Sequence, residues 1–307
     1  PSLSITENGL TYVIGSEQYS AANELNQDNI TLTDNFVMYR GAHTITIGTD
    51  NEFFNTSNVF LRAFYGNYVY NSIADFEDNA AAPNNYDVSY STKGGADKAP
   101  AKIHAGQFGF YGQDVWNATS RLRLTYGLRI DIPVFFNKPS ANTQFNSSEL
   151  AKSHDVATNI IPKSTPLLAP RIGFNLDVNG DGQTQLRGGV GLFTGRVPFV
   201  WISNQYSNTG VESIKYDVSK TGVPASVRFN YDPKDVHLGA YIPANPNSAP
   251  SEIDVTSHDF KYPQVLRANL AVDQKLPWWG LIGTLEGTVT KTIHNINYQD
   301  INLAPST

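Results

Sequence analysis

The segment from Arg121 to Ile132 constrains the fold most, because its apolar and polar residues alternate strictly. Its even-numbered residues are apolar, namely Leu122, Leu124, Tyr126, Leu128, Ile130 and Ile132. Its odd-numbered residues are polar or glycine, namely Arg121, Arg123, Thr125, Gly127, Arg129 and Asp131. Side chains alternate between the two faces of a β-strand, so this segment has one apolar and one charged face. The apolar face is as long as the roughly 9–11 residues of a bilayer-spanning strand, and burial in a soluble sheet is the other interpretation.

The composition excludes several classes of protein. Charged residues make up 16% of the 307 residues, below the roughly one quarter of a soluble globular domain. Cysteine is absent, which rules out a disulfide scaffold, a thiol nucleophile and a cysteine-ligated metal. The net charge of −6, with scattered lysines and arginines, provides no basic surface for nucleic acid. No apolar run reaches the length of a transmembrane helix, but barrel strands give a weaker signal than helices.

The same alternation recurs along the chain and predicts about ten strands with no sustained helical period. The strands are expected near residues 1–8, 10–15, 30–38, 43–47, 106–116, 121–132, 171–177, 184–193, 265–276 and 281–290. Asn8-Gly9 predicts a two-residue hairpin turn between the first two. A polar loop is expected around Asn23, Asn26 and Asp28. Longer loops are expected at about 51–102, 135–168 and 195–262, the first with a short hairpin of its own.

Short turns and long loops alternate along the chain, so all short turns fall at one end of the sheet. Outer-membrane barrels have this asymmetry, with short periplasmic turns and long extracellular loops. A β-sandwich also has loops at its ends, but its strands are usually shorter. Trp116, Trp278 and Trp279 all fall at the short-turn end, which favours the aromatic girdle of a membrane interface. Any one of them, taken alone, fits an ordinary core position equally well.

Three stretches of the sequence resemble the barrel of TonB-dependent outer-membrane receptors. They are FYGQDVWNATSRLRLTYGLRIDIP, LAPRIGFNLDVNGDGQTQLRGGVGLFTGR and YPQVLRANLAVDQKLPWWGLIGTLEGTVTK. The resemblance is to the Bacteroidetes-type group related to the Oar proteins, which often carry a carboxypeptidase-regulatory-like N-terminal domain. It implies a barrel of about 22 strands, closed by an N-terminal plug and energised through TonB.

The resemblance also implies the organisation of the whole protein. We expect residues 1–307 to form part of a single transmembrane β-barrel domain in the outer membrane, with the plug and the remaining strands outside this sequence. The expected partners are the TonB complex, acting through the missing N-terminal region, outer-membrane lipids, and an extracellular peptide, glycan or other bulky nutrient. A surface lipoprotein is a further candidate partner, and nucleic acid is not expected.

The sequence favours binding over catalysis. Asp177 to Gly182 resembles the start of a calcium loop, but Gly188 stands where the loop needs glutamate, so a polar turn is favoured. Gly188-Gly189-Val190-Gly191 lacks the spacing of a phosphate loop. The histidines show no metal-binding or hydrolase pattern; they are His43, His104, His154, His237, His258 and His294. We therefore expect no enzyme, no metal and no cofactor.

Two groups of residues are candidates for ligand contact, although no individual ligand residue is predicted. The first is a charged strand face holding Arg121, Arg123, Arg129, Arg171, Arg187 and Arg267 with Asp131, Asp177 and Asp273. We favour a polar barrel interior over a ligand pathway as the interpretation of this face. The second is the aromatic set of the third long loop, Phe199, Trp201, Tyr206, Tyr216, Phe229, Tyr231 and Tyr241, which suits sugar or peptide capture and packing of the loop on itself equally.

The predicted function is ligand import by a TonB-dependent receptor. Two alternatives stay open: a secreted soluble β-sandwich that binds glycans, and a barrel that serves protein secretion or a surface complex. The first requires apolar strand faces that pack on one another. The second is favoured if the complete protein has no plug and no TonB-binding segment.

Overall fold

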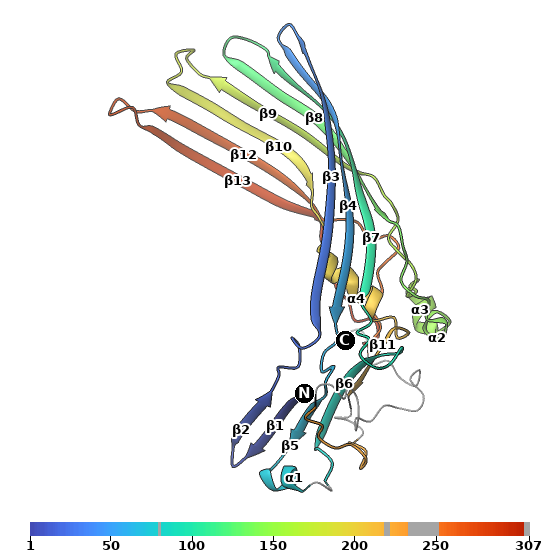
Figure 1. The fold of residues 1–307 in the computed structure, drawn as a ribbon. Helices are drawn as coiled ribbons and strands as arrows, with labels where there is room; N and C mark the ends of the chain where they lie inside the picture. Colours follow the sequence, from blue (N-terminus) through green and yellow to red (C-terminus); the bar gives the residue numbers. More distant parts are fainter. Residues whose placement is uncertain (79–80, 218–221, 233–251, 304–307) are drawn as a thin grey trace.

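The computed structural model describes residues 1–78, 81–217, 222–232 and 252–303, which form two β-sheets placed end to end (Figure 1). The larger sheet has eight strands in the order β13-β12-β10-β9-β8-β7-β4-β3. Its strands are β3 (Asn23–Arg40), β4 (His43–Phe60), β7 (Ala101–Asn117), β8 (Leu122–Phe135), β9 (Leu167–Asp177), β10 (Thr184–Thr194), β12 (Gln264–Lys275) and β13 (Ile282–His294). Every pairing in this sheet is antiparallel, so the chain runs up and down as in a barrel wall.

The register keeps the predicted alternation on two separate faces. Leu128 pairs with Gly112 and Pro170, whereas Arg129 pairs with Tyr111 and Ala169. We call the face that carries Leu128 the outer face and the face that carries Arg129 the inner face.

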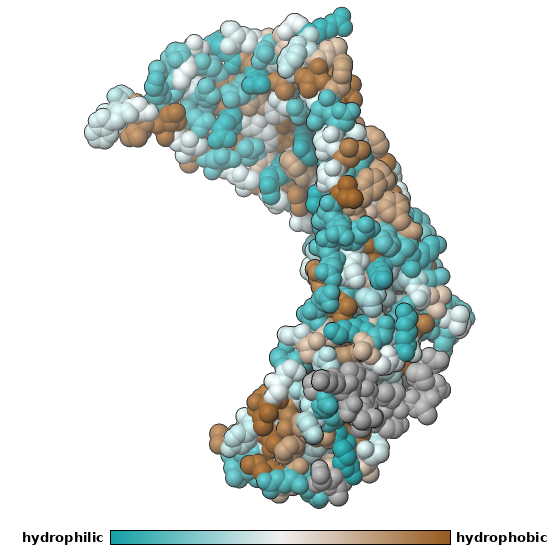
Figure 2. Space-filling model, in the orientation of Figure 1, coloured by the Kyte–Doolittle hydropathy of each residue, from teal (hydrophilic) through white to brown (hydrophobic). Residues whose placement is uncertain are grey.

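Apolar side chains of the outer face are open to the surroundings. Leu128 is 44% exposed, Ile172 is 54% exposed and Leu285 is 79% exposed. In Figure 2, brown side chains follow the convex border of the long strands and gather again at the tip of the smaller sheet. Within the described residues no second sheet packs on the outer face, in contrast to the sandwich alternative.

The connections have the predicted asymmetry. Residues 41–42, 118–121, 178–183 and 276–281 make short turns at one end, and residues 61–100, 136–166 and 195–263 make long loops at the other. Trp116, Trp278 and Trp279 lie at the short-turn end and are 36%, 61% and 94% exposed, as an interfacial girdle requires.

The smaller sheet stands beyond the long-loop end and has the order β11-β6-β5-β1-β2 (Figure 1). Its strands are β1 (Ser2–Glu7), β2 (Leu10–Gly15), β5 (Asn67–Tyr70), β6 (Asn85–Ser91) and β11 (Ser213–Asp217). They come from the first residues of the chain and from two of the long loops. Tyrosines dominate the core of this sheet, where Tyr68, Tyr70, Tyr86 and Tyr90 are at most 4% exposed. The loops therefore build a folded body of their own.

The structure corrects several sequence-based boundaries. Residues 2–15 form the expected hairpin, with φ of 51° at Asn8 and 80° at Gly9, but they belong to the smaller sheet instead of the barrel wall. The predicted loop around Asn23 to Asp28 is wrong, because β3 already begins at Asn23. Strand β4 continues to Phe60 and β7 starts at Ala101, which shortens the first predicted loop. In these outer parts of the strands both faces carry polar residues, so the period-two signal is lost although the backbone pairing continues.

The described loops also contain short helices. They are α1 (Ile73–Glu77), α2 (Thr143–Asn146), α3 (Glu149–Ser153) and α4 (Phe199–Ser207). Each is too short to have produced a clear helical period in the sequence. In the part of the chain that the structure describes, none of the helices has the length and apolar composition needed to cross a membrane.

Candidate functional site

The inner face of the long sheet gathers the charged residues that the sequence placed on one face. Arg129 lies at the centre of the first cluster. Its Nε donates to Oδ1 of Asp131 at 2.8 Å, and its Nη2 donates to Oδ2 of Asp50 at 3.2 Å. The guanidinium also lies 5.6 Å from the ring centre of Tyr111, and Thr33 donates to Asp50 at 2.7 Å. This cluster joins β4 and β8 through paired charges, β3 through a hydrogen bond and β7 through a cation–ring contact.

A second cluster surrounds Arg187 on β10. Its Nε donates to Asp273 at 2.8 Å and its Nη2 donates to Glu286 at 3.4 Å. Thr284 donates to Asp273 at 2.7 Å, and Asn269 donates to Glu286 at 3.1 Å. The two carboxylates of this cluster are therefore already neutralised by the wall itself.

The remaining arginines of the inner face have no carboxylate partner among the described residues. Arg171 packs over the ring of Phe193 at 4.6 Å. Arg267 donates to the hydroxyl of Thr290 at 3.3 Å, and Arg121 donates to the carbonyl oxygen of Val178 at 3.3 Å. Among the residues that the structure describes, the side chain of Arg123 has no hydrogen-bond or carboxylate partner. These arginines therefore keep N–H donors that no carboxylate among the described residues uses.

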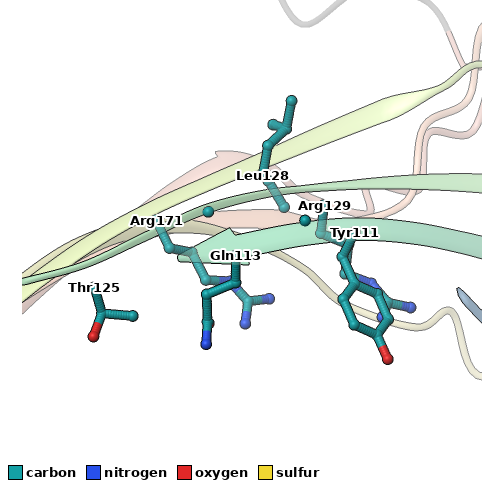
Figure 3. A pocket seen from close by; sticks show the side chains of 9 residues that line it. Tyr111, Gln113, Thr125, Leu128, Arg129 and Arg171 are labelled. Atoms are coloured by element: carbon teal, nitrogen blue, oxygen red, sulfur yellow. The ribbon is translucent and has the colours of Figure 1, made fainter. Parts of the chain in front are cut away.

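Glycines open hollows between these side chains. Figure 3 shows one, of about 330 Å³, in which Tyr111, Gln113, Thr125, Arg129 and Arg171 extend from one side of the sheet and Leu128 from the other. Gly127 lies among them on β8. A Cβ atom there would lie 2.8 Å from the carbonyl oxygen of Gly112, so the backbones approach too closely for any larger residue. Gly127 therefore allows β7 and β8 to approach closely, which is a packing role.

Helix α4 lies over the inner face at the long-loop end of the wall. The ring of Phe199 packs on Phe54 of β4 at 4.9 Å, and Asn58 of β4 donates to Ser203 at 2.7 Å. Tyr206 donates to the carbonyl oxygen of Asn137 at 2.8 Å, and burial raises the pKa of this phenol. These contacts fix the helix across the mouth of the wall instead of leaving the loop in solvent.

One aromatic pair at this mouth is open to solvent. Trp201 of α4 is 45% exposed and meets the ring of Tyr298 at 5.9 Å, with the two planes 76° apart. Tyr298 itself is 66% exposed. Flat, exposed aromatic rings of this kind bind sugar faces and peptide side chains by stacking.

The aromatic residues of the third loop thus divide into two groups. Trp201 and Tyr231 are exposed, whereas Phe199 and Tyr206 pack on the wall and Tyr216 and Phe229 pack against the core of the smaller sheet. Tyr241 lies outside the described residues. Sequence patterns could not single out Trp201, because the burial of each aromatic residue on α4 depends on contacts with β4 and β7, which are distant along the chain.

The other predicted sites behave as structural features. The carboxylate of Asp177 accepts the backbone N–H groups of Gly180 and Gly182, both at 2.9 Å, and closes a tight turn. Asp259 pairs with Lys163 at 2.7 Å, which lowers the pKa of that carboxyl, instead of with the adjacent His258. No group of metal-ligating side chains occurs within the described ranges. His237 lies outside them.

Sequence reasoning missed several charged residues of the site. Asp50, Glu52 and Glu286 supply carboxylates to the inner face, and Glu52 pairs with Arg196 beside α4. One histidine–carboxylate pair was also missed, because His43 and Asp114 are 71 residues apart and meet only through the strand register. Thr44 and Thr46 alternate with Ile45 and Ile47 in β4, and continuing this alternation is the signal that could have extended the inner face to Asp50.

Comparison with known proteins places this architecture in a family. A family model described as an outer membrane beta barrel domain matches residues 1–307. Among solved structures, the outer membrane transporter YddB from Escherichia coli matches 90% of this chain at 12% identity with a TM-score of 0.49. The copper transporter OprC matches 87% at 13% identity with a TM-score of 0.44, and the ferric-catecholate import receptor Fiu from E. coli K12 matches 87% at 13% identity with a TM-score of 0.36.

The matched region is a part of each of these larger proteins. The alignments cover 27% of the YddB chain, 30% of the OprC chain and 31% of the Fiu chain. No curated protein sequence matches this chain.

Proposed function

Since the chain belongs to the outer membrane β-barrel domain family, we propose that it forms part of the wall of a TonB-dependent receptor that imports a bulky ligand. The observation that carries the proposal is the combination of a charged inner face with loops folded over its mouth. A passive pore needs the polar inner face alone. A receptor also needs a structured mouth that holds its ligand, as α4 and the smaller sheet provide here.

The proposal assigns a role to each part of the wall. The exposed pair of Trp201 and Tyr298 at the mouth contacts the ligand first, and a peptide or glycan is the class that such rings accept. The arginines of the inner face line the route below. A plug domain and a TonB-binding segment, both outside this sequence, close the barrel and couple transport to energy.

The test uses the complete gene in its own host. A deletion strain and a strain lacking TonB are compared with the parent strain for growth on defined peptides and on defined oligosaccharides as sole nutrients. We expect both mutant strains to lose growth on the same nutrient. Normal growth of the deletion strain on every nutrient tested, or unimpaired growth of the strain lacking TonB on the nutrient affected by the deletion, would refute import of this kind.

A point variant then links uptake to the mouth. Trp201→Ala should lower uptake of that nutrient while the barrel stays folded, as shown by a gel shift that appears only after boiling. Val200→Ala is the matched control on the same helix, because Val200 is similarly exposed but has no ring to stack.

A second candidate function, assembly of a surface complex, is favoured by strand β2. This strand is the edge of the smaller sheet, and Leu10, Tyr12, Val13 and Ile14 on it are 47% to 70% exposed. An exposed apolar edge strand is a site where another chain adds a strand. Val13→Lys should abolish such a complex, measured by the size of the detergent-extracted full-length protein, without changing nutrient uptake.

A further inference from the structure

A polar cluster lies on the outer face near the short-turn end, where lipid would surround it. Nδ1 of His43 and Oδ2 of Asp114 are 2.6 Å apart, and the hydroxyl of Tyr126 donates to the same oxygen at 2.6 Å. The ring of His43 is parallel to that of Trp116, with centres 5.5 Å apart. In the register, His43 pairs with Trp116 and Asp114 pairs with Tyr126, so all four share the face of Leu128.

Ionisable groups on a lipid-facing surface are costly and are usually kept for a function. This cluster is not fully self-satisfied, because Oδ1 of Asp114 is buried without a hydrogen-bond partner. Nor does the structure give a partner, within its described residues, to Nε2 of His43 or to Arg40. Arg40 pairs with His43 as the last register pair before the turn at residues 41–42, so the two side chains start from neighbouring positions of the outer face.

An apolar hollow adjoins this cluster on the same face. It has a volume of about 390 Å³ and lies over β8, β9 and β10. Its apolar lining consists of Leu122, Leu124, Ile172, Phe174 and Val190. Ile172 is the register partner of Tyr126, so the hollow begins directly beside the residue that holds Asp114. Leu124 and Phe174 of the hollow share the register row of His43 and Trp116, so the polar donors and the apolar hollow lie side by side on the outer face and form one continuous site.

We propose that this site binds a phospholipid of the inner leaflet of the outer membrane. The lipid phosphate accepts hydrogen bonds from the guanidinium of Arg40 and from Nε2–H of His43, and one acyl chain occupies the hollow. Asp114 and Tyr126 are positioning residues, because they hold the imidazole with its second nitrogen directed to the lipid. Arg40 supplies a permanent positive charge on this face, so the site offers a charge-assisted hydrogen bond to a phosphodiester.

The leaflet follows from the orientation of the wall. Short turns of outer-membrane barrels face the periplasm, and Arg40 with His43 is the last register pair before the turn at residues 41–42. Trp116 lies one register row before the last pair of β7 and β8, which is Asn117 with Arg123. Phospholipid phosphates lie at the same level as the aromatic girdle of a membrane protein. The inference rests on family membership and on this cluster, and it is independent of the proposed transport function.

The test measures lipids retained by the full-length protein in native mass spectrometry. Dioleoyl phosphatidylglycerol is compared with dioleoylglycerol, which has the same acyl chains and no phosphate. We expect the phospholipid to be retained preferentially by the wild-type protein. The double variant Arg40→Gln/His43→Gln should lower its retention about tenfold or more, because two charge-assisted hydrogen bonds are lost. Retention of dioleoylglycerol should stay unchanged.

Matched variants separate the site from a general effect on the barrel. His104→Gln is the control, because His104 lies on the same face near the long-loop end and bonds to Asn55 at 2.8 Å instead of to a carboxylate. Tyr126→Phe should lower the ratio of phospholipid to diacylglycerol, which a purely structural loss would not change. Equal retention of both lipids, unchanged binding in the double variant, or displacement of the lipid by excess inorganic phosphate would overturn the proposal.

Discussion

The two sheets of this protein use the same alternation of apolar and polar residues in different ways. In the smaller sheet, the apolar side chains pack under loops of the same chain, and Tyr86 is fully buried. In the long sheet, residues such as Leu128 and Leu285 stay exposed on a continuous outer face. The difference shows that alternation specifies a sheet with two unlike faces, while the surroundings decide what covers the apolar one. In water, the apolar face of a sheet must be covered by other parts of the protein. In a bilayer, lipid covers it instead.

The largest loss of stability should come from a cavity in the core of the smaller sheet. Tyr86→Ala removes a ring that packs on Tyr68 at 4.9 Å, and a cavity of this kind costs about 3–5 kcal/mol. We expect protease cleavage in residues 67–91 of the full-length protein while the barrel keeps its heat-dependent gel shift. Loss of that shift would show that the two sheets do not fold independently and would contradict the comparison.

A smaller effect is expected on the outer face of the long sheet. Leu128→Arg places a charge near the middle of the apolar band, which costs about 2–4 kcal/mol in a bilayer. Urea titration of the full-length protein in lipid vesicles measures this cost. Gln113→Glu is the control, because Gln113 lies on the inner face beside Arg129 and Arg171, where an added carboxylate can pair and should change the unfolding free energy little. Equal costs for the two variants would mean that the outer face does not meet lipid.

The arginines of the inner face should divide into those that stabilise the wall by pairing with carboxylates and those without a carboxylate partner in the described part of the chain. Arg129→Ala leaves Asp131, whose side chain is 4% exposed, without its charge partner, and we expect a loss of about 1.5–3 kcal/mol. Arg171→Ala removes a contact with Phe193 but strands no carboxylate, so its loss should be smaller. The same urea titration ranks the two variants, and a reversed order would refute this division.

The sequence predicted the wall well and the smaller sheet poorly, for a physical reason. Within Arg121 to Ile132 the faces are set by local alternation, which the register confirms. By contrast, β1 pairs with β5 in parallel, joining Leu3 to Tyr68, and no local pattern encodes such a distant pairing. The inner-face arginines were likewise visible in the sequence. The acidic partners of these arginines were predicted only in part, because Asp50 of β4 reaches Arg129 of β8 across the intervening strand β7.

The smallest expected effect concerns a pair of carboxyl groups in the smaller sheet. Asp87 and Asp217 are register partners on β6 and β11, and Asp87 also accepts hydrogen bonds from Asn67 and Arg62 at 3.0 and 3.1 Å. Burial, followed by the charge of Asp217, raises the pKa of Asp87 despite these donors. A raised pKa in the folded state means that the folded sheet holds this proton more tightly than the unfolded chain.

The contribution of Asp87 to stability is therefore complete at pH values below about 4, the unfolded pKa, and is lost as the pH rises through the folded pKa. Asp87→Asn should remove this loss and make protease resistance of the smaller sheet less sensitive to pH, with a slight gain at neutral pH. Asp97→Asn is the control with the opposite sign, because hydrogen bonds from Ser91 and the Ala99 backbone lower the pKa of Asp97. A wild-type sheet that becomes more protease-resistant from pH 4 to pH 7 would contradict the assignment, since it would place the dominant carboxyl among those with lowered pKa.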